Sequence, residues 1–465
     1  MRRTAVAFGF GMAFVIAVLC VFFRPDNAIR VATGDAAHTI CSETFVSGFD
    51  PKEVFAQAIA PYPGLDLLAH GMHVDVDRAK RTVEVDWRGM LESRAIYRDK
   101  IGCLLVVGSG PIDHGVAAGS TAAALLPDIA GPQLVAPSDP RLRAALDRMF
   151  AEPARPPHRW VKAVVVVKDG RVIAERYAPG VGVAAPLLGY SASKSFMNAL
   201  VGILVREGKL NVHAPAPVAA WRGDKRAAIT LDNLLRMTSG LAIAQTGSGF
   251  DPASRMLYTA RDMAGFAEGR PLQEKPGTAM RYSDASTLIV SRIVRDAAGG
   301  TGAAVQTFAR RELFGPLGMK SVVMEMDATG TPVGSTHILA SARDWARLGL
   351  LYLNDGVVAG RRILPEGWVR YSATSTLGTS YGAGFWTNDG KDDDAHGRIA
   401  AGMPCDAFFA SGNLGQRVYV MPSRKLVIVR LGVTPPPDYD IAGDLRFIRD
   451  VLAALGPAPA PVCRR

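Results

Sequence analysis

This 465-residue chain has few of the features that mark metal-binding, nucleic-acid-binding or disulfide-dense proteins. It contains five cysteines, none at the spacing of a zinc site, and His213 and His337 have no partner pattern. Its net charge of +10 is spread over the chain with no basic run beyond short pairs, which argues against nucleic-acid binding. We find no internal repeat. These absences predict a globular protein that needs neither a metal nor another cofactor.

A long apolar run lies at the N-terminus, over residues 5–23, directly after Arg2, Arg3 and Thr4. It is long enough to span a bilayer, and no small-residue cleavage site follows it. We therefore favour a membrane anchor at residues 1–23 over a cleaved signal segment. Because positive charge stays on the cytoplasmic side, the expected location is the inner membrane, with the rest of the chain in the periplasm or outside the cell.

Four cysteines remain outside this segment, an even number that suits disulfides in an exported chain. Four cysteines allow three different pairings. We favour the pairing of Cys41 with Cys103 and of Cys405 with Cys463. Buried free thiols are the alternative.

The chain after the N-terminal segment shows changes of composition that indicate separate parts. Residues 72–77 and 81–87 alternate polar and apolar side chains, as half-exposed strands do. No catalytic pattern is visible near them, so this part is expected to pack on the next one or to shape its cleft. A proline-rich stretch at 154–157 marks a boundary. The predicted parts are a β-rich module at 24–150, a large domain at 155–456 and a Pro/Ala-rich tail at 457–465.

The most informative motif is Ser191-Ala192-Ser193-Lys194, at the start of an apolar helical stretch. A helix advances about 3.6 residues per turn, so the side chains of Ser191 and Lys194 can touch. A serine hydroxyl becomes a good nucleophile only when a neighbouring base takes its proton. The first helical turn also leaves backbone N–H groups that suit an oxyanion. By itself the motif equally describes an ordinary helix start, so further landmarks are needed.

Two later segments supply such landmarks. Tyr282-Ser283-Asp284 follows a Pro-Gly turn and opens an apolar helix. Residues 411–416, Ser-Gly-Asn-Leu-Gly-Gln, lead into an apolar strand that a short polar turn connects to a second strand. Glycines at such a strand entry permit the close approach of a substrate.

In this order and spacing, the three segments resemble the serine hydrolases related to class C β-lactamases. That family includes penicillin-binding DD-peptidases, esterases and 6-aminohexanoate-dimer (nylon-oligomer) hydrolases, and its signature is Ser-x-x-Lys, Tyr-x-Asn and a Lys/His-x-Gly strand. The resemblance covers residues 155–455. Residues 190–196 and the pattern Gly412-x-x-Gly415-Gln416 are most similar to the 6-aminohexanoate-dimer hydrolases.

The resemblance implies an α/β (α+β) fold of the β-lactamase/transpeptidase type. An antiparallel sheet flanked by helices would pack against a mostly helical subdomain at about 195–335, beside the small β-rich N-terminal module. By matched position, Ser191 would form an acyl-enzyme, and Lys194 and Tyr282 would activate first Ser191 and then water. The backbone N–H groups of Ser191 and Gln416 would form the oxyanion hole. The expected substrate-binding residues are Asp284, Asn413, Gly415 and Trp386.

Two positions depart from the family signature. Asp284 stands where many members have asparagine, and a carboxylate there would pair with Lys194 and keep it charged. This shifts the proton-accepting role towards Tyr282, whose phenolate a nearby ammonium would favour. Asn413 stands where β-lactamases and DD-peptidases carry the cation that meets a substrate carboxylate, unless residues 411–412 occupy that position instead.

We therefore expect a serine hydrolase that acts on an uncharged amide or ester, with no cofactor and no nucleic-acid partner. A β-lactamase or DD-peptidase is the second interpretation, and it requires a cation near Asn413. The third interpretation, from another class, is a catalytically inactive penicillin-binding-like module. The complete set of Ser191, Lys194 and Tyr282 argues against the third.

Overall fold

The computed structural model describes residues 25–115, 123–436 and 439–457, together with residues 459, 461 and 463. The predicted anchor at residues 1–23 lies outside the described residues. Within the described parts of the chain, no helix combines the length and the apolar character that a membrane span requires.

A six-stranded antiparallel sheet forms the centre of the large domain, in the order β12-β13-β14-β15-β5-β6. Its strands come from both ends of that domain. Asp169 and Gly170 both have positive φ, the geometry that an Asp-Gly hairpin turn requires, and they join β5 to β6. The strands are β5 (Val161–Lys168), β6 (Arg171–Tyr177), β12 (Trp386–Thr387), β13 (Phe408–Gly412), β14 (Gln416–Met421) and β15 (Leu426–Gly432).

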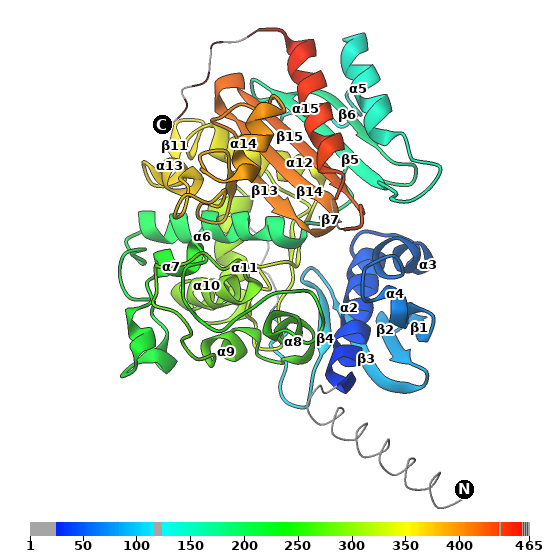
Figure 1. The fold of residues 1–465 in the computed structure, drawn as a ribbon, viewed down its shortest axis with the longest axis vertical. Helices are drawn as coiled ribbons and strands as arrows, with labels where there is room; N and C mark the ends of the chain where they lie inside the picture. Colours follow the sequence, from blue (N-terminus) through cyan, green and yellow to red (C-terminus); the bar gives the residue numbers. More distant parts are fainter. Residues whose placement is uncertain are drawn as a thin grey trace, which may run out of the picture.

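Helices cover both faces of this sheet, because alternate residues of each strand point to opposite sides. On β5, Val164 and Val166 enter the core beneath α5 (Pro140–Phe150) and α15 (Ile441–Leu455). Val165 and Val167 enter the larger core beneath α12 (Ala342–Leu353). α5 lies within residues 24–150, yet it packs against α15 and the sheet (Figure 1). The large domain therefore begins before the predicted boundary at residue 155.

The helical subdomain lies beside the sheet, near the range that the sequence predicted. Its helices are α6 (Ser193–Arg206), α7 (Leu231–Leu235), α8 (Pro252–Thr259), α9 (Met263–Glu268), α10 (Asp284–Ala297) and α11 (Gly302–Ala309). A three-stranded sheet borders it, formed by β7 (Leu187–Leu188), β8 (Val323–Met324) and β9 (Ile338–Ala340). Shorter elements complete the domain: β10 (Val357–Val358), β11 (Arg361–Arg362), α13 (Trp368–Ala373) and α14 (Asp393–Ala400).

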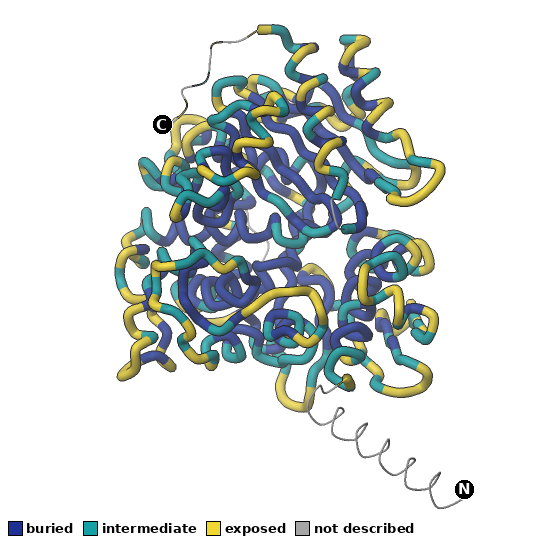
Figure 2. The backbone as a smooth tube through the Cα atoms, viewed as in Figure 1, coloured by how far each residue is buried: buried dark blue, intermediate teal, exposed yellow. Residues whose placement is uncertain are grey.

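The N-terminal module is a four-stranded antiparallel meander that packs against one long helix, α2 (Pro25–Phe45). The helix contacts the meander on one side and α8 on the other, so most of its small side chains are buried (Figures 1 and 2). A helix buried all round shows no amphipathic period, which explains why the sequence indicated only strands here. The remaining elements are α3 (Pro51–Val54), α4 (Asp66–Ala69), β1 (Met72–Asp77), β2 (Thr82–Trp87), β3 (Met90–Arg98) and β4 (Gly102–Val106).

Both predicted disulfides are present. Cys41 on α2 pairs with Cys103 on β4, across a Cα–Cα distance of 6.1 Å, and ties the helix to the meander. Cys405, just before β13, pairs with Cys463, across 5.5 Å. The two cross-links therefore serve different parts of the molecule.

Candidate active site

The nucleophile candidate lies in a tight turn at the start of α6. Tyr190 has a left-handed backbone (φ 44°), and a 3₁₀ turn over Tyr190–Ala192 leads into the helix. Lys194, one turn further on, donates a hydrogen bond from Nζ to Ser191 Oγ at 2.9 Å. The pair that the sequence predicted is therefore in contact.

Lys194 is buried, with 3% of its surface exposed, and two further oxygens surround its ammonium group. It makes a short contact with the carboxylate of Asp284, and it donates to the carbonyl oxygen of Ser335 at 3.0 Å. Gln245 holds the other side of Asp284: its Nε2 donates to Oδ2 at 2.9 Å, and its Oε1 accepts from the Asp284 N–H at 2.6 Å. The pairing of Lys194 with Asp284, expected from the sequence, is present.

Tyr282 lies beside this pair, with Lys194 Nζ 4.8 Å from the centre of its ring. Burial, and then the charge of Asp284, raise the pKa of Tyr282 above its ordinary value, while Ser191 and Arg417 act in the opposite direction. The expectation that the ammonium favours a phenolate is thus wrong for this state, because the ammonium lies over the ring and a carboxylate lies nearby. Tyr282 is a neutral phenol here.

These residues open onto a cavity of about 760 Å³ between the large domain and the N-terminal module. The large domain contributes Ser191, Tyr282, Asp284 and Trp386 to its wall, together with most of residues 411–417. The module contributes α2 and the loop around Tyr62. This size suits a small-molecule substrate.

The turn between β13 and β14 brings the backbone close to the nucleophile. A Cβ atom added at Gly412 would lie 2.1 Å from the carbonyl oxygen of Gly189, so only glycine fits this approach. Asn413 follows on the cavity wall, as predicted for a substrate-binding residue.

Two predicted residues of this turn do not reach the cavity. Gln416 is 2% exposed and is not among the described residues that line the cavity, and its side chain donates to the carbonyl oxygens of Asn413 and Gly432. The role of its backbone N–H in the oxyanion hole stays a prediction. Gly415 (φ 87°) instead makes room for Arg430, whose Nη1 would lie 2.3 Å from an added Cβ atom. Gly415 is therefore structural, and its predicted contact with substrate is corrected.

An aromatic wall stands next to Tyr282. The Trp386 ring lies 5.6 Å from the Tyr282 ring and 5.2 Å from the Tyr381 ring, and Trp386 lines the cavity as predicted. Tyr381 is 1% exposed and packs behind both rings. Phe385 belongs to the core, where it contacts Tyr352. Of these three aromatic residues, Trp386 is the one that lines the cavity.

Sequence reasoning missed Arg417, which lies on the cavity wall and is 5% exposed. Its Nη1 donates to the carbonyl oxygens of Gly412 and Gln416, at 3.0 and 2.8 Å. It is the one lysine or arginine among the described residues that line the cavity. The sequence does show an arginine directly after residues 411–416, which lead into the strand. Its orientation towards the cavity, however, depends on the conformation of the turn.

Three buried side chains, His38, Glu325 and His337, bring possible metal-ligand atoms within 4.8 Å of one another. The two imidazole rings stack face to face, 3.7 Å apart, and His38 Nε2 lies 2.9 Å from Glu325 Oε2. Burial lowers the pKa of His337 well below its ordinary value. The group forms a buried polar contact between the module and the large domain.

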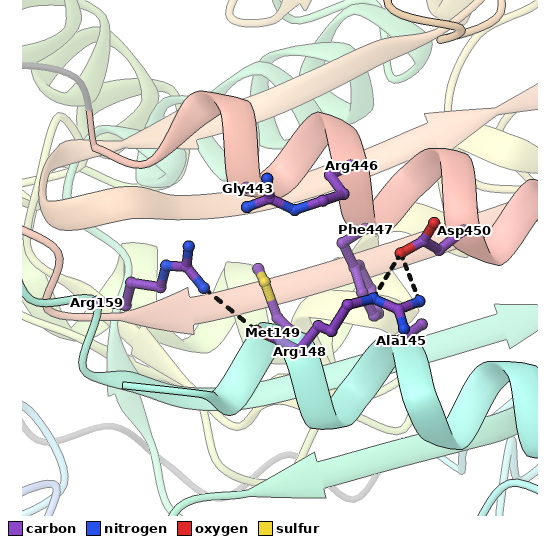
Figure 3. Close-up of a pocket in the computed structure, with 8 residues that line it drawn as sticks. All are labelled: Ala145, Arg148, Met149, Arg159, Gly443, Arg446, Phe447 and Asp450. Carbon is purple, nitrogen blue, oxygen red and sulfur yellow. Dashed lines mark hydrogen bonds and ion pairs between the residues drawn. The ribbon is translucent and has the colours of Figure 1, made fainter. Parts of the chain in front are cut away.

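A second pocket, between α5 and α15, measures about 10 Å³ (Figure 3). Arg148 and Asp450 pair across it at 2.8 Å, and Arg159 donates to the carbonyl oxygen of Arg148. It has room for about one water molecule, so it offers no site for a substrate.

The comparisons with known proteins agree with this geometry. A family model described as Beta-lactamase matches residues 147–453, the part that holds the sheet, α6 and Tyr282. The chain belongs to the beta-lactamase family. This membership confirms the predicted resemblance and fold and assigns the chain to a family of serine hydrolases.

Individual relatives are distant. The chain is 26% identical over 330 residues to the 6-aminohexanoate-dimer hydrolase of Paenarthrobacter ureafaciens, which covers 65% of this chain and 80% of that protein. A penicillin-binding protein homolog from Caulobacter crescentus superposes with a TM-score of 0.54 at 18% identity, over 70% of this chain and all of that one. A family VIII carboxylesterase gives 0.52 at 15% identity, over 69% and 99%. At these identities the structures support the fold alone.

Proposed function

We propose that this beta-lactamase-family protein hydrolyses an amide or ester bond through an acyl-enzyme on Ser191. The observation that carries the proposal is the contact of Ser191 with Lys194, beside Tyr282, on the wall of a cavity of about 760 Å³. The similarity to the 6-aminohexanoate-dimer hydrolase supports an amide substrate.

The buried Lys194–Asp284 pair supplies the base in this mechanism. For Lys194 to accept the hydroxyl proton, its ammonium must first pass a proton to Asp284, which it contacts directly, and this leaves a neutral amine next to Ser191. The amine takes the hydroxyl proton as Ser191 Oγ bonds to the substrate carbonyl carbon. Lys194 therefore acts as the general base, and Asp284 holds the displaced proton.

Tyr282 acts as the general acid, because its phenol is protonated and interacts with Ser191 on the cavity wall. The phenol gives its proton to the leaving nitrogen or oxygen as the bond to the carbonyl carbon breaks. The Lys194 ammonium, 4.8 Å from the ring centre, then returns a proton to the phenolate. Water repeats the sequence in the second half, and it releases the acid and restores Ser191.

The oxyanion hole combines the N–H of Ser191 with an N–H from the β13–β14 turn. Asn413 replaces Gln416 in this proposal, because Asn413 lines the cavity and follows the closest approach of the turn to the nucleophile. Donors fixed in position before reaction stabilise the charge that develops on the carbonyl oxygen.

Intact-mass spectrometry after exposure to a fluorophosphonate tests the proposal. We expect one adduct, lost in Ser191→Ala and kept in Ser193→Ala, where the altered hydroxyl is buried at the first residue of α6. An unlabelled wild-type chain would contradict the proposal and support the inactive-module interpretation.

A penicillin in a parallel sample tests a second candidate, a β-lactamase or DD-peptidase. Arg417 favours it, because a guanidinium on the cavity wall can meet a substrate carboxylate. A penicillin adduct at Ser191 that Arg417→Gln abolishes would select this candidate. Absence of that adduct beside a fluorophosphonate adduct would select uncharged amides and esters.

We also propose a periplasmic location, with anchoring through residues 1–23. The apolar run and the two disulfides support it, since disulfides persist in oxidising compartments. Fractionation of cells that express the full chain, before and after removal of residues 1–23, checks this.

A further inference from the structure

One face of α2 forms a wall of the catalytic cavity. Ala28, Ala32, Asp35 and Thr39 all line it, and their spacing of three to four residues places them on one side of the helix. The wall is apolar at one end and polar at the other. This polar end belongs to the N-terminal module, outside residues 147–453, which match the family model.

Asp35 is a carboxylate without a strong cationic partner. Thr39 donates to it at 3.1 Å, and Tyr258 interacts with it, but among the described residues no lysine or arginine forms an ion pair with it. His38 lies nearby and is engaged with Glu325 at 2.9 Å. Burial raises the pKa of Asp35, so the free anion is unfavourable where it stands.

The other acidic residue of the cavity wall differs in this respect. Asp284 contacts the Lys194 ammonium, which balances its charge. Within the described lining, Asp35 is therefore the acidic side chain left to meet a cation that enters the cavity.

Three tyrosines, Tyr62, Tyr190 and Tyr258, line the same cavity as this carboxylate. The charge of Asp35 contributes to raising the pKa of each of them. Burial raises the pKa of all three, so they remain neutral and offer ring faces and hydroxyl oxygens. Aromatic faces beside a carboxylate are a typical environment for an ammonium group.

We propose that Asp35, with Tyr62, Tyr190 and Tyr258, forms a subsite for an alkylammonium group of the substrate. Tyr190 directly precedes Ser191 and interacts with Thr39, so the subsite adjoins the nucleophile. The inference deepens the proposed function, on which it rests: the amide or ester would carry an amino group near the scissile bond. An ammonium ion would offset the desolvation of Asp35, and a neutral group would leave it unpaired.

Binding can be measured without catalysis. Isothermal titration calorimetry on the full chain at pH 7.5 would compare n-hexylammonium with 1-hexanol, which differ in charge but share the alkyl chain. We expect hexylammonium to bind at least about tenfold more tightly, a difference of about 1.4 kcal/mol. Equal affinity for the two ligands would overturn the inference, whatever the catalytic activity.

The variant Asp35→Asn should remove this preference and leave the affinity for hexanol unchanged, which also shows that the cavity is intact. Asp75→Asn, on the exposed side of β1, is the matched control and should keep the preference. Hexylammonium should also slow the fluorophosphonate labelling of Ser191 in the wild type, which places the ligand in the catalytic cavity. An unchanged preference in Asp35→Asn would refute the subsite, whereas a wild type that binds hexylammonium but is never labelled would refute only the proposed function.

Discussion

The two walls of the cavity differ in how their polar groups are satisfied. On the large-domain wall, Lys194 contacts Ser191, Asp284 and the Ser335 carbonyl, so each charge has its partner inside the protein. On the module wall, Asp35 has two hydroxyl-bearing neighbours and no ion pair with a lysine or arginine in the described chain. The contacts of Lys194 fix it in position beside the nucleophile. Asp35, which has no counter-ion in the described chain, is available to bind a charged group of a ligand.

We therefore expect the large-domain wall to carry out the reaction and the module wall to recognise the substrate. The large-domain wall lies within residues 147–453, which match the family model, and the N-terminal module supplies the other wall. One fold can therefore act on different substrates when a separate part of the chain shapes the substrate space. The comparison predicts that changes on the first wall reduce kcat and that changes on the second alter KM.

The largest expected effect is on the large-domain wall. Tyr282→Phe removes the proposed general acid, and kcat should fall by about 10³-fold, within the range of acid–base catalysis. Tyr381→Phe is the matched control, because the Tyr381 hydroxyl is buried and finds no hydrogen-bond partner among the described residues. Its ring lies 5.5 Å from the Tyr282 ring, so both variants alter the same cluster.

Steady-state kinetics on an activated ester, with thermal unfolding of each variant, checks this. Similar losses of kcat in the two variants would mean that the aromatic packing matters and the Tyr282 proton does not. A retained Tm with a selective loss in Tyr282→Phe would support the proposed role.

The parts of the fold that the sequence predicted are those with strong local patterns. The β14–β15 hairpin shows two apolar strands and a clear turn, and Ser191 and Lys194 meet because one helical turn separates them. Local geometry is enough in both cases. The expected export and the even cysteine count predicted disulfides but left three pairings open, and the favoured pairing is the one present.

The parts that were missed depend on distant contacts. Most of the small side chains of α2 are buried, so its sequence has no amphipathic periodicity from which a helix at the cavity could be predicted. Arg417 reaches the cavity because Leu414 and Gly415 both have positive φ and reverse the chain before β14. The proton on Tyr282 depends on burial and on Asp284, which only the assembled site brings together.

The two disulfides allow the walls to be perturbed separately. Their sequence separations are 62 and 58 residues, so their loss should lower stability by similar amounts, about 2–4 kcal/mol each. Removal of the Cys41–Cys103 bond by double alanine substitution should also raise KM several-fold, because that bond holds α2 against β4. Removal of the Cys405–Cys463 bond should leave KM near its wild-type value. Equal KM changes in the two variants would mean that the module is not a separate recognition wall.

The smallest effect concerns the pH dependence of the module. Burial raises the pKa of Glu43, on α2, to about 7. A carboxyl group whose pKa is higher in the folded than in the unfolded state stabilises the fold most below pH 4.5, and this contribution is lost as the pH rises from 4.5 through 7. Glu43→Gln removes the charge, so its free energy of unfolding should exceed that of the wild type at pH 8, by on the order of 1–3 kcal/mol.

The difference should shrink towards zero at pH 4.5, where both side chains are neutral in the folded state. Urea unfolding at the two pH values measures it, and Glu92→Gln, at an exposed position of β3, is the control that should change little at either. The expected effects distinguish Glu43 from Asp35 on the same helix. Loss of Glu43 should stabilise the helix without affecting ligand preference, whereas loss of Asp35 should abolish the ammonium preference. If Glu43→Gln also changed the ratio of hexylammonium to hexanol affinity, the charge recognised in the cavity would belong to the whole helix rather than to Asp35.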